Sequence, residues 1–353
     1  MLYKFPKLIT HQSYRLNRNL VYFFSKLRGV NQHSTLNPLS NYFDAEFSHF
    51  LGLNKQQTLR THFTTFFDEF KILDPNEKNL VIQIFTDSQK IGNILTNTHF
   101  NGNSIKTDSL PASIRDATRA LFNYLFSNTL NSFGKLKDHY KTVFNSLQSN
   151  ICPFCGIEFL NDPSIIRQDY DHMLMISSYA LSGVNMDNLI PTGVECNRIN
   201  KHNVDVLYNG AVRTVFNSAY TQSFDIRISL HGSTPPSRPT DIGNWHITIT
   251  PTNSFTSEWE RVYNIKNRYT NNVLKKFYSG WLKELREYLF ISDRLPINEQ
   301  NLLNELTASS LVMKENPTLS LSNIVKGAVY EFLANNNDPA YRTAVLSYIN
   351  SRT

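Results

Sequence analysis

The sequence predicts a mainly α-helical protein with a small irregular module near its middle and a short β element after it. Apolar residues recur at helical spacing in the first 150 residues and again after residue 258, whereas between 224 and 250 they alternate with polar residues. All three cysteines fall inside residues 151–203. We therefore expect a helical N-terminal region (1–150), a central module (151–210), and a β-hairpin followed by a helical C-terminal region (211–353).

The composition indicates a folded chain with a sizeable core. Hydrophobic residues make up 41% of the 353 residues and aromatic residues 12%, which excludes wholesale disorder. No stretch approaches the roughly 18 consecutive apolar residues of a membrane span. The net charge of +6 is modest for a nucleic-acid-binding protein. Three cysteines are too few, and odd in number, for a disulfide framework, so a reducing, cytoplasmic compartment fits best.

Residues 1–150 are expected to form a packed helical layer. Helical periodicity is clearest over 112–130, which is entered through Pro111, and over 136–147. The first acidic residue is Asp44, and the basic residues before it are Lys4, Lys7, Arg15, Arg18, Lys26 and Arg28. This acid-free start has three interpretations: a transit peptide, a basic surface that faces nucleic acid or a partner, or an ordinary solvated face.

The central module contains the residues suited to chemistry. It opens with Cys152-Pro-Phe-Cys155, a turn in which two thiolates can point at one metal ion. The motifs Tyr-Asp-His at 170–172, Asp-Asn-Leu at 187–189 and Cys-Asn-Arg-Ile-Asn-Lys-His at 196–202 follow. No helical or strand period explains this spacing, which indicates a functional site.

At these residues the sequence resembles the HNH endonucleases, a family with a ββα-metal fold. Asp171-His172 matches the family's strand pair, Asn188 its loop asparagine, and Asn197 the position on the following helix. The resemblance implies a small ββα-metal HNH module with His172 and Asn188 as the catalytic residues. It also implies that Asp171 and Asn197 bind a catalytic Mg²⁺ or Mn²⁺.

A wider pattern is similar to a prokaryotic branch of this family that includes the nuclease subunits of Septu-type antiviral systems. The matching residues are Asp171, His172, Leu174, Ser177, Tyr179, Val184, Asn185, Asn188, Leu189, Ile190, Pro191, Cys196, Asn197 and Lys201. The stretch 259–269 (WERVYNIKNRY) is similar to an aromatic helix that often follows in that branch. This resemblance implies DNA as the substrate, with RNA not excluded, and an ATPase partner subunit of the SMC or ABC type.

The residue types also suit phosphodiester hydrolysis on chemical grounds. A histidine such as His172 titrates near neutrality and can activate water as a base. Asp171 and Asn197 offer hard oxygen ligands, although Asn197 has a second interpretation as a helix cap. Asn188 would orient the ring of His172, either by accepting a hydrogen bond or by bracing the loop.

Three further residues follow on the last helix of the module. Arg198 and Lys201 are expected near its start, where they would attract phosphate. His202 is either a third metal ligand or an exposed histidine.

The cysteines suggest a second, softer metal site. Cys152, Cys155 and Cys196 would supply three thiolates to a structural Zn²⁺. The family usually has a second C-x-x-C motif, but the residue three before Cys196 is Gly193, so a fourth ligand would have to come from elsewhere. The alternative is three reduced cysteines packed in a small core.

The expected function is therefore that of a metal-dependent HNH endonuclease, the nuclease component of a prokaryotic antiviral complex. Two alternatives stay open. The module could be a non-catalytic zinc knuckle that binds nucleic acid or protein, or the protein could be a stand-alone nuclease toxin.

Overall fold

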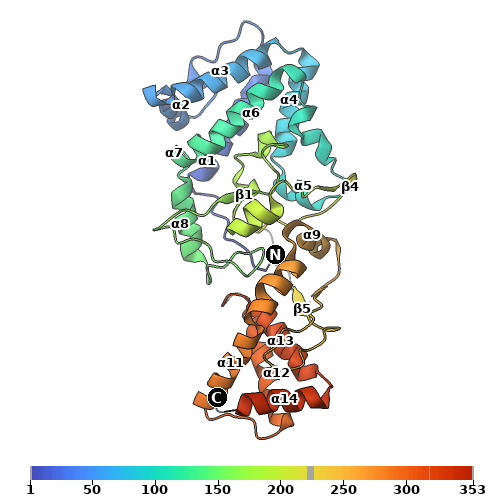
Figure 1. The fold of residues 1–353 in the computed structure, drawn as a ribbon. Coiled ribbons are helices and arrows are strands. Elements are labelled where there is room, and N and C mark those ends of the chain that lie inside the picture. Colours follow the sequence, from blue (N-terminus) through green and yellow to red (C-terminus); the bar gives the residue numbers. More distant parts are fainter. Residues whose placement is uncertain (1, 221–225, 318, 352–353) are drawn as a thin grey trace.

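The computed structural model describes residues 2–220, 226–317 and 319–351. Within these residues the chain is mainly helical, with a few short two-stranded antiparallel sheets, which confirms the predicted fold class. Figure 1 shows an elongated molecule, in which the N-terminal helices, the central module and the C-terminal helices follow one another along the long axis. None of the described helices is long and apolar enough to cross a membrane.

The N-terminal region is helical, as predicted. Its α-helices are α1 (Ser13–Lys26), α2 (Ala45–Gly52), α3 (Gln57–Ile72), α4 (Pro75–Ser88), α5 (Ile91–Thr96), α6 (Arg115–Tyr124), α7 (Leu130–Ser132) and α8 (Leu136–Ser146). A π-helical segment, η7 (Leu125–Thr129), joins α6 to α7. Buried phenylalanines hold the helices together, among them Phe24 and Phe85, whose stacked rings lie 3.7 Å apart.

The first residues of the chain pack against its body. Leu2 and Phe5 are buried, and the backbone N–H of Leu2 donates to the carbonyl of Pro153 in the central module. Lys7 lies 2.7 Å from Asp187, and Arg15 forms ion pairs with acidic residues near the start of α2. Part of the basic charge in this segment is therefore neutralised within the molecule.

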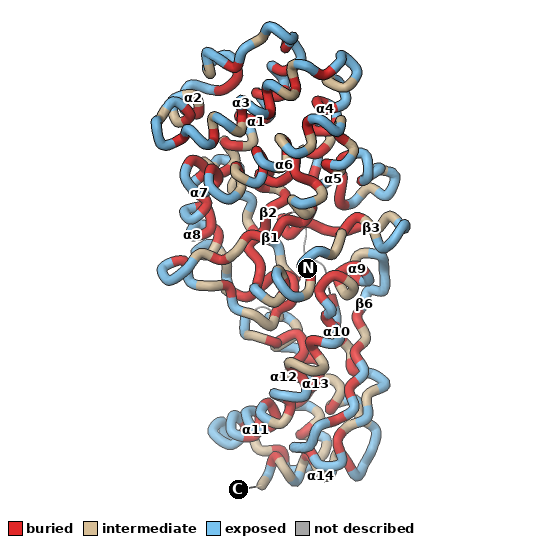
Figure 2. The backbone as a smooth tube through the Cα atoms, turned by 45° about the horizontal axis from the view of Figure 1, so that its top comes forward, coloured by how far each residue is buried: buried red, intermediate tan, exposed pale blue. Residues whose placement is uncertain are grey.

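The central module consists of two short strands and a helical segment. Strand β1 (Tyr170–His172) pairs antiparallel with β2 (Leu189–Pro191), and the π-helical segment η10 (Glu195–Lys201) follows. The connection between the strands contains the short turns η8 (Ala180–Ser182) and η9 (Met186–Asn188). Tyr170 and Leu189 pack into the N-terminal core, whereas the neighbouring Ile190 packs into the C-terminal core. The strands thus lie between the two cores, in the buried middle of the molecule (Figure 2).

The C-terminal region begins with small β elements. Strand β3 (Tyr208–Asn209) pairs with β4 (Val212–Arg213), and β5 (Arg227–Ser229) pairs with β6 (Thr248–Thr250). The second pair confirms the predicted hairpin, although Phe224, with which the predicted first strand begins, lies outside the described residues. The helices that follow are α9 (Ser254–Tyr263), α10 (Ile265–Arg268), π-helical η11 (Tyr269–Leu274), α11 (Lys275–Ile291), α12 (Glu299–Glu315), α13 (Asn323–Asn335) and α14 (Pro339–Asn350).

Candidate functional site

Strand β1 places Asp171 and His172 in the protein interior. In the antiparallel register Asp171 lies opposite Ile190, and His172 lies opposite Leu189. The strand is covered by both cores, so the Asp171 residue is only 4% exposed. His172 is also buried, with 9% of its surface exposed.

The ring of His172 is held by a backbone carbonyl and an aromatic ring. Its Nε2 lies 2.9 Å from the carbonyl oxygen of Gly183, and the ring of Phe126 on η7 meets it edge to face, with centroids 4.3 Å apart. A carbonyl can only accept a hydrogen bond, so Nε2 must bear the proton and Nδ1 the free lone pair. Burial lowers the pKa of His172 to about 4, so the ring is neutral at pH 7.

Asp171 forms a buried ion pair with Lys201, a residue that was expected to face phosphate. The ammonium Nζ lies 2.9 Å from Asp171 Oδ1 and 2.6 Å from the backbone oxygen of His172, and the Lys201 side chain is 1% exposed. Burial raises the pKa of Asp171 to about 6, although Lys201 opposes that shift. The other carboxylate oxygen, Oδ2, is buried and has no hydrogen-bond partner within the described chain.

The predicted position of Lys201 near the start of the helix is wrong. The helical segment begins at Glu195, and Lys201 is its last residue rather than one near its start. Lys201 points inward because its ammonium compensates the buried carboxylate of Asp171. Arg198 is better placed for an external anion: its side chain is 66% exposed, and it forms an ion pair with Asp169.

Asn188 braces the loop. The alternative prediction, that Asn188 accepts a hydrogen bond from the ring of His172, is wrong. Its Oδ1 accepts a hydrogen bond from the backbone N–H of Leu174 at 2.7 Å. Its Nδ2 donates to the carbonyl oxygens of Leu174 and Ser182. The carbonyl of Gly183, and not Asn188, accepts the hydrogen bond of the His172 ring. Asn188 thus fixes the two ends of the connection that bears Gly183.

Asn197 and His202 are both more exposed than their neighbour Lys201. Asn197 is partly exposed and precedes Lys201 by four residues, about one turn of η10, so it shares the face that reaches Asp171. The residue that caps this segment is Val194, so the interpretation of Asn197 as a helix cap is wrong. No hydrogen bond of the Asn197 side chain occurs in the part of the chain that the structure describes. His202 is exposed, directly after the end of η10.

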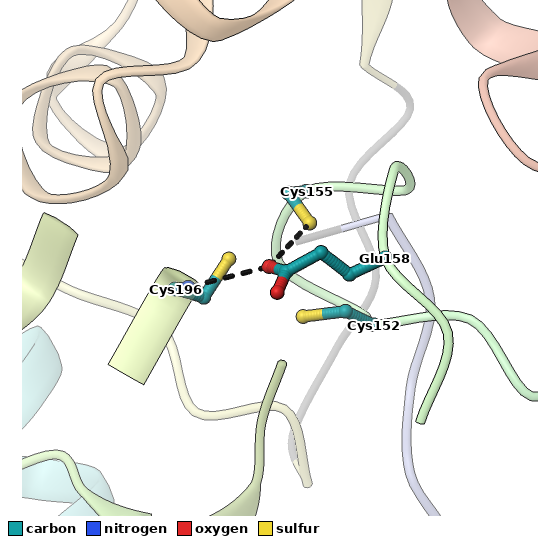
Figure 3. Close-up of side chains that lie close together, drawn as sticks. All are labelled: Cys152, Cys155, Glu158 and Cys196. Carbon is teal, nitrogen blue, oxygen red and sulfur yellow. Dashed lines mark hydrogen bonds between the residues drawn. The ribbon is translucent and has the colours of Figure 1, made fainter. Parts of the chain in front are cut away.

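The three cysteines meet in a second cluster, together with a residue that the sequence prediction missed. One ligand atom each of Cys152, Cys155, Cys196 and Glu158 lies within 4.8 Å of the others. Figure 3 shows the carboxylate of Glu158 between the thiols, with Cys196 reaching in from η10. Glu158 follows the C-x-x-C turn by three residues, and this short spacing was the only signal for it.

No protein-family model, no curated protein and no solved structure matches this chain.

The π-helical segments supply residues to both clusters. Segment η7 supplies Phe126 beside His172, and η10 supplies both Lys201 and Cys196. Segment η11 begins with Tyr269, whose hydroxyl donates to the carbonyl of Cys155 at 2.8 Å. Single π-helical turns are rare and frequently occur at functional sites. Their gathering here supports the central module as the functional centre of the molecule.

Proposed function

We propose that this protein is a metal-dependent endonuclease of the HNH type that hydrolyses phosphodiester bonds in DNA. The observation on which the proposal rests is the state of His172. Its Nε2–H donates to the carbonyl of Gly183, which leaves the lone pair on Nδ1, and Nδ1 makes no hydrogen bond to the described residues. A neutral imidazole with a fixed tautomer is the form that can accept a proton from water.

The unpartnered oxygen of Asp171 supports a divalent cation beside this histidine. A buried carboxylate oxygen without a partner requires an explanation, such as an ion or a water molecule. Asp171 Oδ2 and the free amide of Asn197 are hard donors that suit Mg²⁺ or Mn²⁺, ions that keep several waters and need few protein ligands. A cation held there would stabilise negative charge on the scissile phosphate.

The substrate and the biological setting follow from the resemblance rather than from the geometry. The motif is similar to that of DNA-cleaving enzymes of antiviral complexes, so the proposal includes a cytoplasmic setting and an ATPase partner of the SMC or ABC type. Co-purification from the native host is expected to recover that ATPase. A protein that cleaves DNA at full rate alone would contradict this part of the proposal and favour a stand-alone nuclease toxin.

One observation favours the non-catalytic alternative. Lys201 already compensates the charge of Asp171, and both side chains are buried. Such a pair would also suit a binding module that uses the fold only as a scaffold. An assay of cleavage separates the two candidate functions.

The experiment is incubation of the purified protein with supercoiled plasmid, with EDTA or with millimolar Mg²⁺ or Mn²⁺. We expect cleavage only with a divalent cation. His172→Gln should lower the rate by about 10² to 10⁴, because glutamine can still donate to Gly183 but offers no imidazole base. His99→Ala, which removes an exposed histidine outside the module, is the matched control. Wild-type rates in His172→Gln would overturn the proposal.

A further inference from the structure

We propose that Cys152, Cys155, Cys196 and Glu158 together hold one Zn²⁺, with Glu158 as the fourth ligand. We infer further that this centre fastens the C-terminal helices to the central module. This inference is independent of the proposed nuclease activity, because the residues involved are not those of the His172 site.

The geometry and the donor set both fit zinc. The four ligand atoms lie within 4.8 Å of one another. Tetrahedral ligands at about 2.0 to 2.3 Å from one ion lie about 3.3 to 3.8 Å apart, so an inward shift of about 1 Å would bring the four atoms to an ion. All three cysteines are completely buried. Thiolates select zinc over Mg²⁺, and a carboxylate oxygen is an accepted fourth ligand.

Glu158 occupies the space that a side chain at position 193 would need. A Cβ atom added to Gly193 would lie 2.6 Å from Glu158 Oε2 and 2.7 Å from the carboxylate carbon. Position 193 is three residues before Cys196, where a second C-x-x-C motif would place its first cysteine. The carboxylate thus replaces the missing thiolate, and the absence of a side chain on Gly193 makes room for it.

Two donors beside the cluster favour negative charge on the sulfur atoms of Cys152 and Cys196, whereas the Cys155 thiol donates to Glu158 in the absence of an ion. The backbone N–H of Gly193 donates to Cys152 Sγ at 3.3 Å, and Nη1 of Arg268 donates to Cys196 Sγ at 3.1 Å. These donors are of the kind that orient and tune metal ligands. A core of packed neutral thiols would need neither a guanidinium nor a carboxylate turned into it.

The carboxylate of Glu158 is also fixed in place. Its Oε1 accepts a hydrogen bond from the backbone N–H of Glu195 at 2.8 Å, and Oε2 accepts from the backbone N–H of Cys196 and from Nη2 of Arg268. Three thiolates and one carboxylate would bring four negative charges into the interior. Arg268 compensates one of them, and a divalent cation would compensate two more, as buried charges require.

The C-terminal helices contact the same loop through three side chains. Trp259 Nε1 donates to the carbonyl of Phe154 at 2.6 Å, and the hydroxyl of Tyr269 donates to the carbonyl of Cys155 at 2.8 Å. Arg268 adds its bonds to Cys196 and Glu158. Phe154 and Cys155 belong to the C-x-x-C turn, and the partners of Arg268 are the other two ligand residues, so an ion that fixes the turn and these ligands also fixes the docking of α9, α10 and η11.

The first test measures metal binding directly. Wild-type protein produced in zinc-supplemented medium should contain about one zinc per chain by elemental analysis. Competition with a chromogenic chelator should show that Glu158→Gln weakens zinc binding at least tenfold, whereas the matched control Glu195→Gln, which also removes a carboxylate beside Arg268, leaves it unchanged. Zinc-free wild-type protein, or equal affinity in Glu158→Gln, would overturn the assignment.

A ligand exchange provides a second readout that does not depend on zinc affinity. Wild-type protein loaded with Co²⁺ should show thiolate-to-cobalt absorption with the intensity of three thiolate ligands. Glu158→Gln should show the same intensity, because it removes no thiolate. In Glu158→Ser/Gly193→Cys the absorption should rise to four-thiolate intensity, because the new cysteine takes the vacated space. Equal intensity in wild type and the double variant would contradict the placement of Glu158.

The fastening role is tested by hydrogen exchange on the wild-type protein. Removal of zinc should lower the protection of amides in α9, α10 and η11, while α3 and α4, which lie in the other core, keep theirs. Unchanged protection in the C-terminal helices of zinc-depleted protein would show that the ion does not fasten them.

Discussion

Lys201 Nζ lies 2.9 Å from Asp171 Oδ1, and the two side chains are 1% and 4% exposed. The pair joins the last residue of η10 to strand β1 across the interior of the module. A buried charge pair of this kind contributes little net stability compared with apolar residues, but loss of one partner is costly because the other charge is left alone. The pair therefore ties the position of η10 to that of the candidate catalytic strand.

The first prediction concerns this pair. Lys201→Met should destabilise the protein by about 3 to 5 kcal/mol, because Asp171 is left buried without its counter-charge. Asp171→Asn/Lys201→Met, which removes both charges, should recover most of that loss in urea denaturation. Arg198→Ala is the control, since its exposed pair with Asp169 is expected to contribute less than about 1 kcal/mol. Wild-type stability of Lys201→Met would show that the pair is not needed.

The second prediction tests the metal ligands. Brief EDTA treatment should abolish cleavage without unfolding, and millimolar Mg²⁺ or Mn²⁺ should restore it, because a cation with few protein ligands exchanges freely. Asn197→Ala should prevent the restoration while the unfolding temperature stays unchanged, since the side chain is partly exposed and makes no hydrogen bond to the described residues. Asp171→Ala should also prevent the restoration, but it leaves Lys201 buried without its counter-charge and should lower the unfolding temperature as well. Full recovery in Asn197→Ala would move the ligand role to His202.

The third prediction concerns the brace of the loop. Asn188→Ala removes three hydrogen bonds and leaves the buried N–H and carbonyl of Leu174 without a partner among the described residues, whereas the carbonyl of Ser182 keeps its bond from the backbone N–H of Asn185. Each such group costs about 1 to 3 kcal/mol, so a loss of several kcal/mol is expected by chemical denaturation. Asn200→Ala, which removes a single bond from a partly exposed side chain, should cost about 1 kcal/mol. Similar losses in the two variants would contradict the bracing role.

The fourth prediction concerns pH. His139 is fully buried beside Tyr170, with Nδ1 2.6 Å from the tyrosine oxygen, and burial lowers its pKa to about 3. Between pH 6.5 and 3 the unfolded chain therefore binds a proton that the folded protein does not, so this histidine's contribution to stability falls as the pH falls. The loss should approach about 1.4 kcal/mol per pH unit.

Urea denaturation at pH 7 and pH 4.5 measures this effect. His139→Gln should lose less stability between the two pH values than the wild type does, because its side chain does not titrate. Other groups, such as His172 and Asp171, titrate equally in both proteins and cancel in the comparison. The same pH dependence in both proteins would show that His139 is not the group responsible.

Local patterns in the sequence were sufficient for much of the architecture. Helical periodicity predicted the helices around 112–130 and 136–147, and alternation predicted the pairing of β5 with β6. These predictions are confirmed because the apolar periodicity of a helix or strand depends only on residues close together in the sequence. The motif spacing also drew attention to the segment in which β1, β2 and η10 lie.

The sequence by itself determined which residue types are available in the module: Asp171 and His172 on one strand, Asn188 in the connection, and three cysteines. Only the tertiary structure decided that Lys201 turns inward to Asp171 and that Glu158 joins the cysteines. It also decided that Phe126, which precedes the module in the sequence, lies beside His172, and that Arg268, which follows the module, contacts Cys196. The physical reason is that charged residues such as Lys201 and Glu158 are usually solvated. Such residues become buried only where distant segments bring a compensating charge or hydrogen-bond donor to them, and a local sequence pattern does not predict such a long-range contact.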